Sequence, residues 1–235
     1  MARYSGIDGV AVYPYRKDDA LLASLIKIYD ADIPIVQIEY QALNRPKSVF
    51  IGTNSFDFGK AIGRLALQSG SESLRVALVY SEKNPGLMAD GNLLEMGMKS
   101  IMEKRLSVLR SARTSLNPLD AERLTNELIR SDERHDLIVY TDTNDTLVAV
   151  QAIIDMNLVG TVQIIGFGDD PAIAGYINKG VVLGSIVRDP YGIGFNAVLA
   201  LAKIKSSGHT SAYVDTAISV IDGKNVGSRG DGAPR

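Results

Sequence analysis

The sequence predicts an α/β protein built on parallel β-sheet. Short apolar runs rich in Val and Ile alternate with longer amphipathic stretches, which is the pattern of repeated strand-helix units. The chain shows no long antiparallel meander, so the connections are expected to be right-handed crossovers. With 235 residues, 46% hydrophobic and 22% charged, its composition is that of an ordinary globular protein.

The first half of the chain contains five apolar runs separated by three amphipathic stretches. Asn54 or Ser55 is placed to cap the second of these helices, because a short polar side chain accepts a hydrogen bond from an unpaired backbone N–H at a helix start. The expected strands are 9–13, 33–38, 49–52, 74–80 and 106–109, and the expected helices are 18–29, 54–68 and 87–104.

The second half marks its helix starts by a capping side chain that precedes a proline. Asn117-Pro118, Asp170-Pro171 and Asp189-Pro190 each have this form, and proline loses no hydrogen bond at the first helical position. A further helix is expected over 147–156. The expected strands are 136–140, 162–167, 181–187 and 213–221, and the glycine-rich segment 227–235 is expected to be a disordered tail.

Charge and residue content exclude several classes of function. The 25 basic and 27 acidic side chains give a net charge of −2, so no basic excess is present to neutralise nucleic-acid phosphates. The absence of cysteine and the presence of only two histidines argue against a thiolate nucleophile, a zinc site or a serine-histidine triad, and no metal or cofactor is expected. Phosphate-loop, dinucleotide-loop and nucleophile-elbow motifs are also absent.

Polar residues follow directly after most of the predicted strands. Ligands of open α/β sheets bind at the carboxyl ends of the strands, so these residues are the candidates for a site. They are Tyr13, Glu39, Tyr40, Asn54, the segments 81–84, 141–145 and 168–170, Arg188 and Asp189. Asp142 and Asp169 could form the carboxylate pair of a glycosidase, or they could accept hydroxyl hydrogen bonds and cap helices.

Several segments, in order along the chain, resemble the sugar-binding periplasmic proteins of type I. The resemblance extends over about residues 6–226 and rests on their common order and spacing. The segments are 7–14 (IDGVAVYP), 33–36 (IPIV), 52–55 (GTNS) with Gly59 and Gly63, Asp142 before 147–150 (LVAV), 165–169 (IGFGD), 187–190 (VRDP) with Gly192 and Gly194, and 213–216 (YVDT).

This resemblance implies two Rossmann-like lobes joined by crossing hinge segments, with a monosaccharide bound in the cleft between them. The implied crossings lie near Thr53-Asn54, Arg188-Asp189 and 211–213. They place 1–53 and 189–212 in one lobe, 54–188 and 213–226 in the other, and leave 227–235 as the tail. The first lobe then lacks its leading strand-helix units, and we expect its uncovered edge to support self-association.

The resemblance also implies which side chains contact the ligand. They are Tyr13, Glu39, Tyr40, Asn54, Asn92, Asp142, Asp169 and Arg188. The chain departs from the family pattern at several positions. Tyr40 and Leu94 stand where arginines are common, and Arg188 replaces an amide. Asp169 is displaced by one position from the family's aspartate, because Gly168 takes that place. These changes leave the identity of the sugar open.

The implied function is non-catalytic binding of a small sugar or polyol. The protein would serve as the solute-binding protein of an ABC transporter or as the sensing domain of a signalling system. Its partners would be the sugar and a transporter permease or membrane sensor, in a periplasmic or extracellular location that is membrane-associated in a Gram-positive host. The alternative is the effector-binding domain of a LacI-type transcription regulator, which would be cytoplasmic; this chain itself is not expected to bind nucleic acid.

Overall fold

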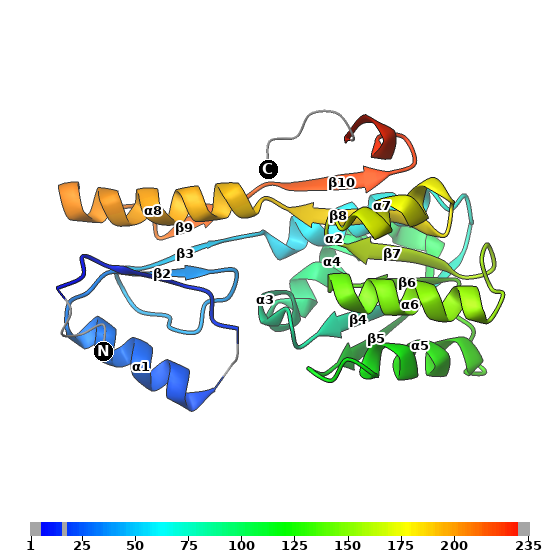
Figure 1. Cartoon of the computed structure of the whole chain (residues 1–235), viewed down its shortest axis with the longest axis horizontal. Helices are drawn as coiled ribbons and strands as arrows, with labels where there is room; N and C mark the ends of the chain where they lie inside the picture. The colour runs from blue at the N-terminus through cyan, green and yellow to red at the C-terminus, as the bar shows by residue number, and fades with distance from the viewer. Residues whose placement is uncertain (1–5, 16–17, 230–235) are drawn as a thin grey trace. The chain divides into compact units, whose positions relative to one another are not determined.

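A computed structural model describes residues 6–15 and 18–229, and these residues form two compact units (Figure 1). Unit 1 lies within 1–54 and 188–217, and unit 2 lies within 55–187 and 218–235. The chain therefore passes between the units three times, after Asn54, Val187 and Ala217.

Unit 1 is a parallel four-stranded sheet in the order β1-β2-β3-β9, with one helix on each face. Its elements are β1 (Val10–Val12), α1 (Asp19–Asp30), β2 (Ile35–Ile38), β3 (Ser48–Gly52), α8 (Pro190–Ser207) and β9 (Tyr213–Asp215). Alternate residues of a strand point to opposite faces, so Ile35 packs with Leu25 of α1 and Val36 packs with Ala197 of α8. Figure 1 shows α8 above this sheet and α1 below it.

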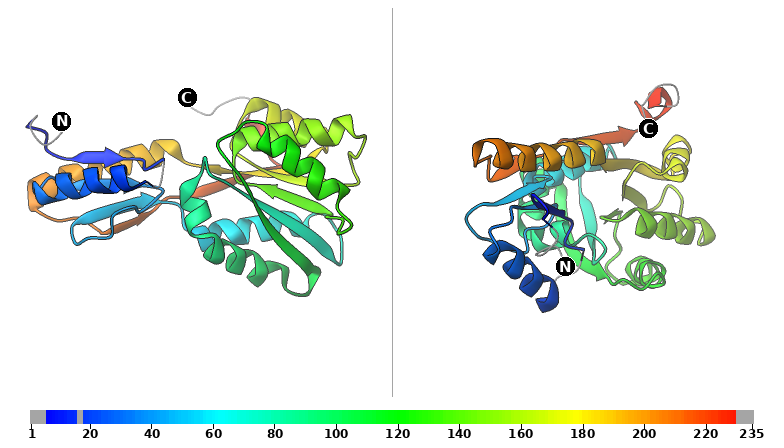
Figure 2. Two further views of the ribbon diagram at one scale, coloured as in Figure 1. Left: turned by 90° about the horizontal axis from the view of Figure 1, so that it is seen from below. Right: turned by 60° about the vertical axis from the view of Figure 1, so that its left-hand side comes forward.

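Unit 2 is a six-stranded sheet in the order β10-β8-β7-β6-β4-β5, covered by helices on both faces (Figure 2). Helices α2, α3 and α4 pack on one face and α5, α6 and α7 on the other, which makes its strands buried on both sides. The elements are α2 (Ser55–Leu67), β4 (Leu74–Ser81), α3 (Pro85–Ala89), α4 (Gly91–Met102), η2 (Glu103–Arg105), β5 (Leu106–Thr114), α5 (Asp120–Arg130), β6 (Leu137–Tyr140), α6 (Thr143–Asp155), β7 (Gln163–Phe167), α7 (Pro171–Asn178), β8 (Val182–Arg188), β10 (Ile218–Asp222) and η3 (Val226–Arg229).

The predicted fold class, an α/β protein with two parallel-sheet lobes, is confirmed, and two proline-marked helix starts are also correct. The Asp170 side chain accepts a hydrogen bond from Ala172 N at 2.8 Å, and Asp189 accepts one from Gly192 N at 2.9 Å. The third start is displaced because Asn117 instead caps a turn, accepting from Leu119 N, and α5 begins at Asp120. Within the described residues, no helix is both long and apolar enough to cross a bilayer.

Other sequence predictions also differ from the structure. The helix expected over 87–104 is broken at Asp90, where α3 ends and α4 begins. The strand expected over 213–221 is two strands: β9 pairs with β3 in unit 1, so 213–215 do not belong to the second lobe as expected, and β10 lies in unit 2. The predicted tail begins too early, since Val226–Arg229 form a 3-10 turn that packs on α7; residues 230–235 lie outside the described part.

Helices α2 and α4 approach each other so closely that glycine is required at the contact. A Cβ atom on Gly59 would collide with the carbonyl oxygen of Leu94, which is backbone and cannot rotate away. We expect Gly59→Ala to lower the free energy of unfolding by about 1–3 kcal/mol or more, measured by urea denaturation. Gly175→Ala in α7 is the control, because its Cβ would meet open space, and it should be neutral or stabilising by less than about 1 kcal/mol. Equal effects of the two substitutions would contradict this packing.

Candidate functional site

In unit 1, a buried ion pair lies at the carboxyl ends of the strands. Arg188 is the last residue of β8 and the first residue after the chain crosses into unit 1, and Glu39 directly follows β2. The Arg188 guanidinium Nη2 lies 3.0 Å from Glu39 Oε2. Only 13% of the Arg188 side chain and 5% of the Glu39 side chain are exposed. A buried pair of this kind holds both groups in fixed positions, because either charge alone would be costly to bury.

The environment of this pair is set by burial and by a strained backbone. Burial lowers the pKa of Arg188, while the negative charge of Glu39 opposes that shift. Thr53 Oγ1 donates a hydrogen bond to Glu39 Oε1 at 3.1 Å. Glu39 has φ = 60°, a left-handed conformation that is uncommon for residues with a side chain and is found at functional sites.

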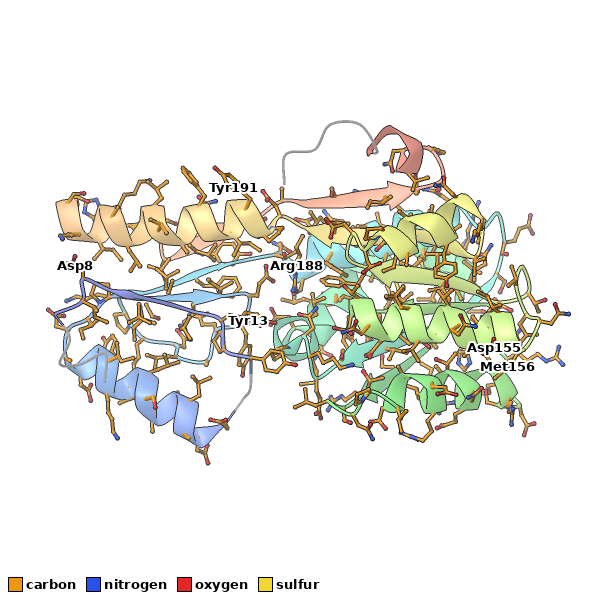
Figure 3. The ribbon with its side chains drawn as sticks, in the orientation of Figure 1. Asp8, Tyr13, Asp155, Met156, Arg188 and Tyr191 are labelled. Carbon is orange, nitrogen blue, oxygen red and sulfur yellow. The ribbon has the colours of Figure 1, made fainter. Side chains whose placement is uncertain are left out.

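The other predicted residues of unit 1 surround the same sheet end. Figure 3 shows Tyr13 at the end of β1, on the same side of unit 1 as Arg188, and the Tyr13 ring is exposed. Tyr40 follows Glu39 and is buried. The backbone N–H of Asn54 donates to Asp215 Oδ1 at 3.1 Å, so the end of β9 also reaches this edge.

In unit 2, a second polar cluster lies at the carboxyl ends of β4, β5 and β6. Lys83 Nζ lies 2.6 Å from Asp145 Oδ1 and 3.8 Å from Asp142 Oδ1. Asp145 Oδ2 accepts a hydrogen bond from Thr114 Oγ1 at 2.6 Å, and the Asp145 side chain is only 2% exposed. Asn84 donates its side-chain N–H to the Thr141 carbonyl at 2.8 Å. This hydrogen bond connects the loop after β4 to the end of β6.

Asp142 has a structural role and an electrostatic cost. Its Oδ1 accepts a hydrogen bond from Asp145 N at 3.0 Å and so caps α6. Its pKa is raised, chiefly by burial and also by the neighbouring Asp145 carboxylate, although Lys83 and the capping hydrogen bonds oppose the shift. An ionised Asp142 is therefore held in a place that disfavours its charge, which is typical of residues kept for function.

The two remaining predicted residues of unit 2 are both exposed. Asp169 lies between β7 and α7, after Gly168, whose φ of 93° favours glycine. Asn92 lies on α4 and lines a cavity of about 320 Å³ together with Tyr80, Glu95 and Arg113. Among the described residues, Asn92 makes no hydrogen bond with Asp142 or Asp169, so the structure does not join it to the Lys83 cluster.

Several residues of this arrangement were not among the predicted ligand residues. They include Lys83, Thr114, Asp145 and Asp215. Lys83 and Asp145 lie in the segments after β4 and β6 that the strand-end rule singles out. Their pairing was not visible because they are 62 positions apart in sequence.

The chemistry available to these groups is hydrogen bonding. Carboxylates accept, and the guanidinium and ammonium donate, so each cluster offers the mixed donors and acceptors that vicinal hydroxyl groups require. In the part of the chain that the structure describes, no group of three or more His, Cys, Asp or Glu side chains could hold a metal ion.

Replacing Asp142 by asparagine is expected to stabilise the unliganded protein at neutral pH. Asparagine also caps helices, so the hydrogen bond to Asp145 N is kept while the disfavoured charge is removed. The pKa of Asp142 is higher in the folded protein than its unfolded value of about 3.8, so the folded state binds this proton more tightly. The resulting contribution to the free energy of unfolding is present at low pH and is lost as the pH rises through the folded-state pKa.

Urea denaturation between pH 4 and pH 8 measures this effect. The wild-type free energy of unfolding should decline relative to that of Asp142→Asn as the pH rises, and then the difference should become constant. A variant that is less stable than the wild type at pH 7 would show that the Asp142 charge is favourable in the fold.

Comparison with known proteins identifies the family of this fold. A family model described as the periplasmic binding protein domain matches residues 3–209. A search of curated protein sequences finds no match.

Solved structures of sugar-binding proteins share the fold at low sequence identity. One is a myo-inositol binding protein from Caulobacter bound to myo-inositol, with a TM-score of 0.82 and 15% identity over 97% of this chain and 78% of that chain. Another is a sugar-binding protein of a sugar ABC transporter from Bacillus halodurans, with a TM-score of 0.78 and 19% identity over 97% and 81%. A third is a glucose-galactose binding protein from Geobacillus stearothermophilus, with a TM-score of 0.76 and 19% identity over 95% and 79%.

The family model spans most of the chain, and the two parallel-sheet units connected by three chain crossings agree with it. The chain belongs to the periplasmic binding protein domain family.

Proposed function

We propose that this protein binds a small sugar or polyol without changing it chemically. The observation that carries the proposal is that each unit ends its parallel sheet in a cluster of hydrogen-bonding side chains, Arg188 with Glu39 in unit 1 and Lys83 with Asp142 and Asp145 in unit 2. Solved proteins with this fold are described as binding glucose or galactose, arabinose, D-allose and myo-inositol, which supports a polyhydroxylated ligand.

Each cluster offers groups that a sugar can contact. In unit 1 the fork of Arg188 would donate two parallel hydrogen bonds to neighbouring hydroxyl groups, and the exposed ring of Tyr13 would cover an apolar face of the sugar. In unit 2 Asp142 would accept a hydroxyl hydrogen bond. The proposed set also includes Asn92 and Asp169 of unit 2, and Glu39, Tyr40 and Asn54 of unit 1. No residue of this set is assigned a nucleophilic or acid-base role.

A thermal-unfolding screen against pentoses, hexoses and inositols tests the proposal. A ligand that binds only the folded state at about 100 times its Kd stabilises it by about 2.7 kcal/mol, which gives a clear rise in Tm. One or a few stereochemically related sugars should raise the Tm, and the recovered sugar should be unchanged by chromatography. If every member of the panel leaves the Tm unchanged, or if the sugar is converted, the proposal fails.

We further propose a periplasmic or extracellular location, with the sugar-loaded protein recognised by the permease of an ABC transporter or by a membrane sensor. The proposal is supported by the family and by neighbours that are themselves solute-binding proteins of ABC transporters. Reconstitution with a candidate permease in vesicles would test it: sugar uptake should depend on this protein, and uptake without it would contradict the role.

Unit 1 also carries features that favour association with a second copy of the chain. Strand β1 lies at the edge of its sheet, where an edge strand presents unpaired backbone groups. Tyr191 and Phe195 of α8 are 80% and 56% exposed, and their rings stack with centroids 6.3 Å apart. Figure 3 shows Tyr191 pointing away from the sheet of unit 1.

Light scattering over a range of concentrations is expected to show a concentration-dependent dimer. Phe195→Ser should weaken it, because this substitution removes exposed aromatic surface, whereas Leu119→Ser, at a similarly exposed apolar position in unit 2, should not. A strict monomer at high concentration would exclude the association.

A further inference from the structure

The Lys83 cluster carries an excess of negative charge. One ammonium group, on Lys83, faces two carboxylates, on Asp142 and Asp145, and all three side chains are at most 17% exposed. The cluster therefore has a formal charge of −1 when all three groups are ionised.

The two carboxylates do not share the ammonium equally. Both oxygens of Asp145 are engaged, Oδ1 by Lys83 at 2.6 Å and Oδ2 by Thr114 at 2.6 Å. Asp142 lies 3.8 Å from Lys83, beyond direct hydrogen-bond distance, and its pKa is raised by burial and by Asp145. Asp142 is therefore the less fully compensated of the two carboxylates, although its Oδ1 also caps α6.

The proposed site in unit 1 adds no surplus positive charge. Arg188 is offset by Glu39 at 3.0 Å, in a pair of which both members are buried. An anionic ligand that contacted Arg188 would have to compete with this carboxylate, whereas a cationic ligand that contacted Asp142 would supply the charge that the unit 2 cluster lacks.

We propose that Asp142 makes the ligand site selective for an aminated sugar over its neutral parent, and for the neutral parent over the corresponding acid sugar. The inference rests on the proposed function, since it names the class of sugar bound at that site. A protonated amine beside Asp142 gains a charge-assisted hydrogen bond, while a ligand carboxylate there meets a like charge in a partly desolvated place. Discrimination then comes from repulsion as well as attraction.

Calorimetric titration with matched sugars tests the inference. Glucose, galactose and mannose are each compared with their amino derivatives, bearing the amine at carbon 2, 3 or 6 in turn, and with their uronic acids, at a pH where the amines are protonated. For the preferred stereochemistry, the best amine should bind on the order of 10-fold more tightly than the neutral sugar, and the acid on the order of 10-fold more weakly.

Two variants separate the effect of Asp142 from a general effect of charge. Asp142→Asn should bring the best amine within about threefold of the neutral sugar and should improve binding of the acid. Asp155→Asn removes the same charge from the opposite end of the same helix, where Asp155 accepts from Gln151, and it should leave both preferences unchanged (Figure 3).

The outcomes are distinct. If a neutral sugar binds but no amine binds better, or if Asp142→Asn retains the wild-type preferences, the charge selectivity is wrong while sugar binding stands. If no sugar of this set binds, and no pentose, hexose or inositol of the thermal screen binds, the proposed function itself is overturned, and the inference with it.

Discussion

Replacing Arg188 by alanine is expected to lower the free energy of unfolding of unit 1 by about 3–5 kcal/mol, as well as to weaken ligand binding. The substitution leaves the Glu39 carboxylate buried with Thr53 as a hydrogen-bond donor but without its cation. Urea denaturation, followed by the hydrogen exchange of the β2 and β3 amides, measures the loss in unit 1.

A surface ion pair provides the control for Arg188. Arg75 pairs with Asp136 at 2.7 Å, but both side chains are more than one-third exposed, so Arg75→Ala should cost no more than about 1 kcal/mol. The double variant Arg188→Met with Glu39→Gln removes both charges and should recover much of the stability without recovering ligand affinity. Equal losses from Arg188→Ala and Arg75→Ala would show that the Arg188 pair contributes little to folding.

The second large effect is expected from Lys83→Met, which should destabilise unit 2 by about 3–5 kcal/mol at neutral pH. Removing the ammonium leaves Asp145 buried beside Asp142 and takes away the positive charge that opposes the raised folded-state pKa of Asp142. The destabilisation should therefore be present above that raised pKa and become smaller as the pH falls through it, because protonation removes the unpaired charge.

Denaturation at pH 7.5 and at pH 5 measures this pH dependence. Lys99→Met is the matched control: its side chain is 54% exposed, and its pair with Glu95 at 3.5 Å should contribute less than about 1 kcal/mol. Lys83→Met combined with Asp145→Asn should be more stable than Lys83→Met alone. A loss from Lys83→Met that does not vary with pH would indicate lost packing of the lysine stem instead of an unpaired charge.

Local patterns were sufficient to predict most of the fold. The Val- and Ile-rich runs predicted the strands because residues buried on both faces of a parallel sheet leave a continuous apolar signal. Asp170 and Asp189 predicted their helix starts because capping depends on neighbouring residues alone. The apolar pattern over 213–221 concealed a change of sheet, since both β9 and β10 are strands and only their partners differ.

The candidate site was less accessible to sequence reasoning. Arg188 and Asp142 were predicted as ligand residues because each follows a predicted strand. The partners that set their charge come from distant parts of the chain. Glu39 was expected to contact the ligand, and its pairing with Arg188 depends on the tertiary fold of unit 1. The separation of Asn92 from the Lys83 cluster follows from the position of α4 on the opposite face of the sheet from α6, which no local pattern shows.

Calorimetric titration of the sugar selected by the thermal screen into the wild type, Arg188→Lys and Asp142→Asn is the most direct test of sugar binding by the residues that the sequence predicts. The wild type should bind one sugar per chain. Each variant should bind it on the order of 10-fold more weakly, because Arg188→Lys loses the two-donor fork and Asp142→Asn replaces an ionised acceptor by a neutral amide. No saturable heat in the wild type, or wild-type affinity in both variants, would contradict it.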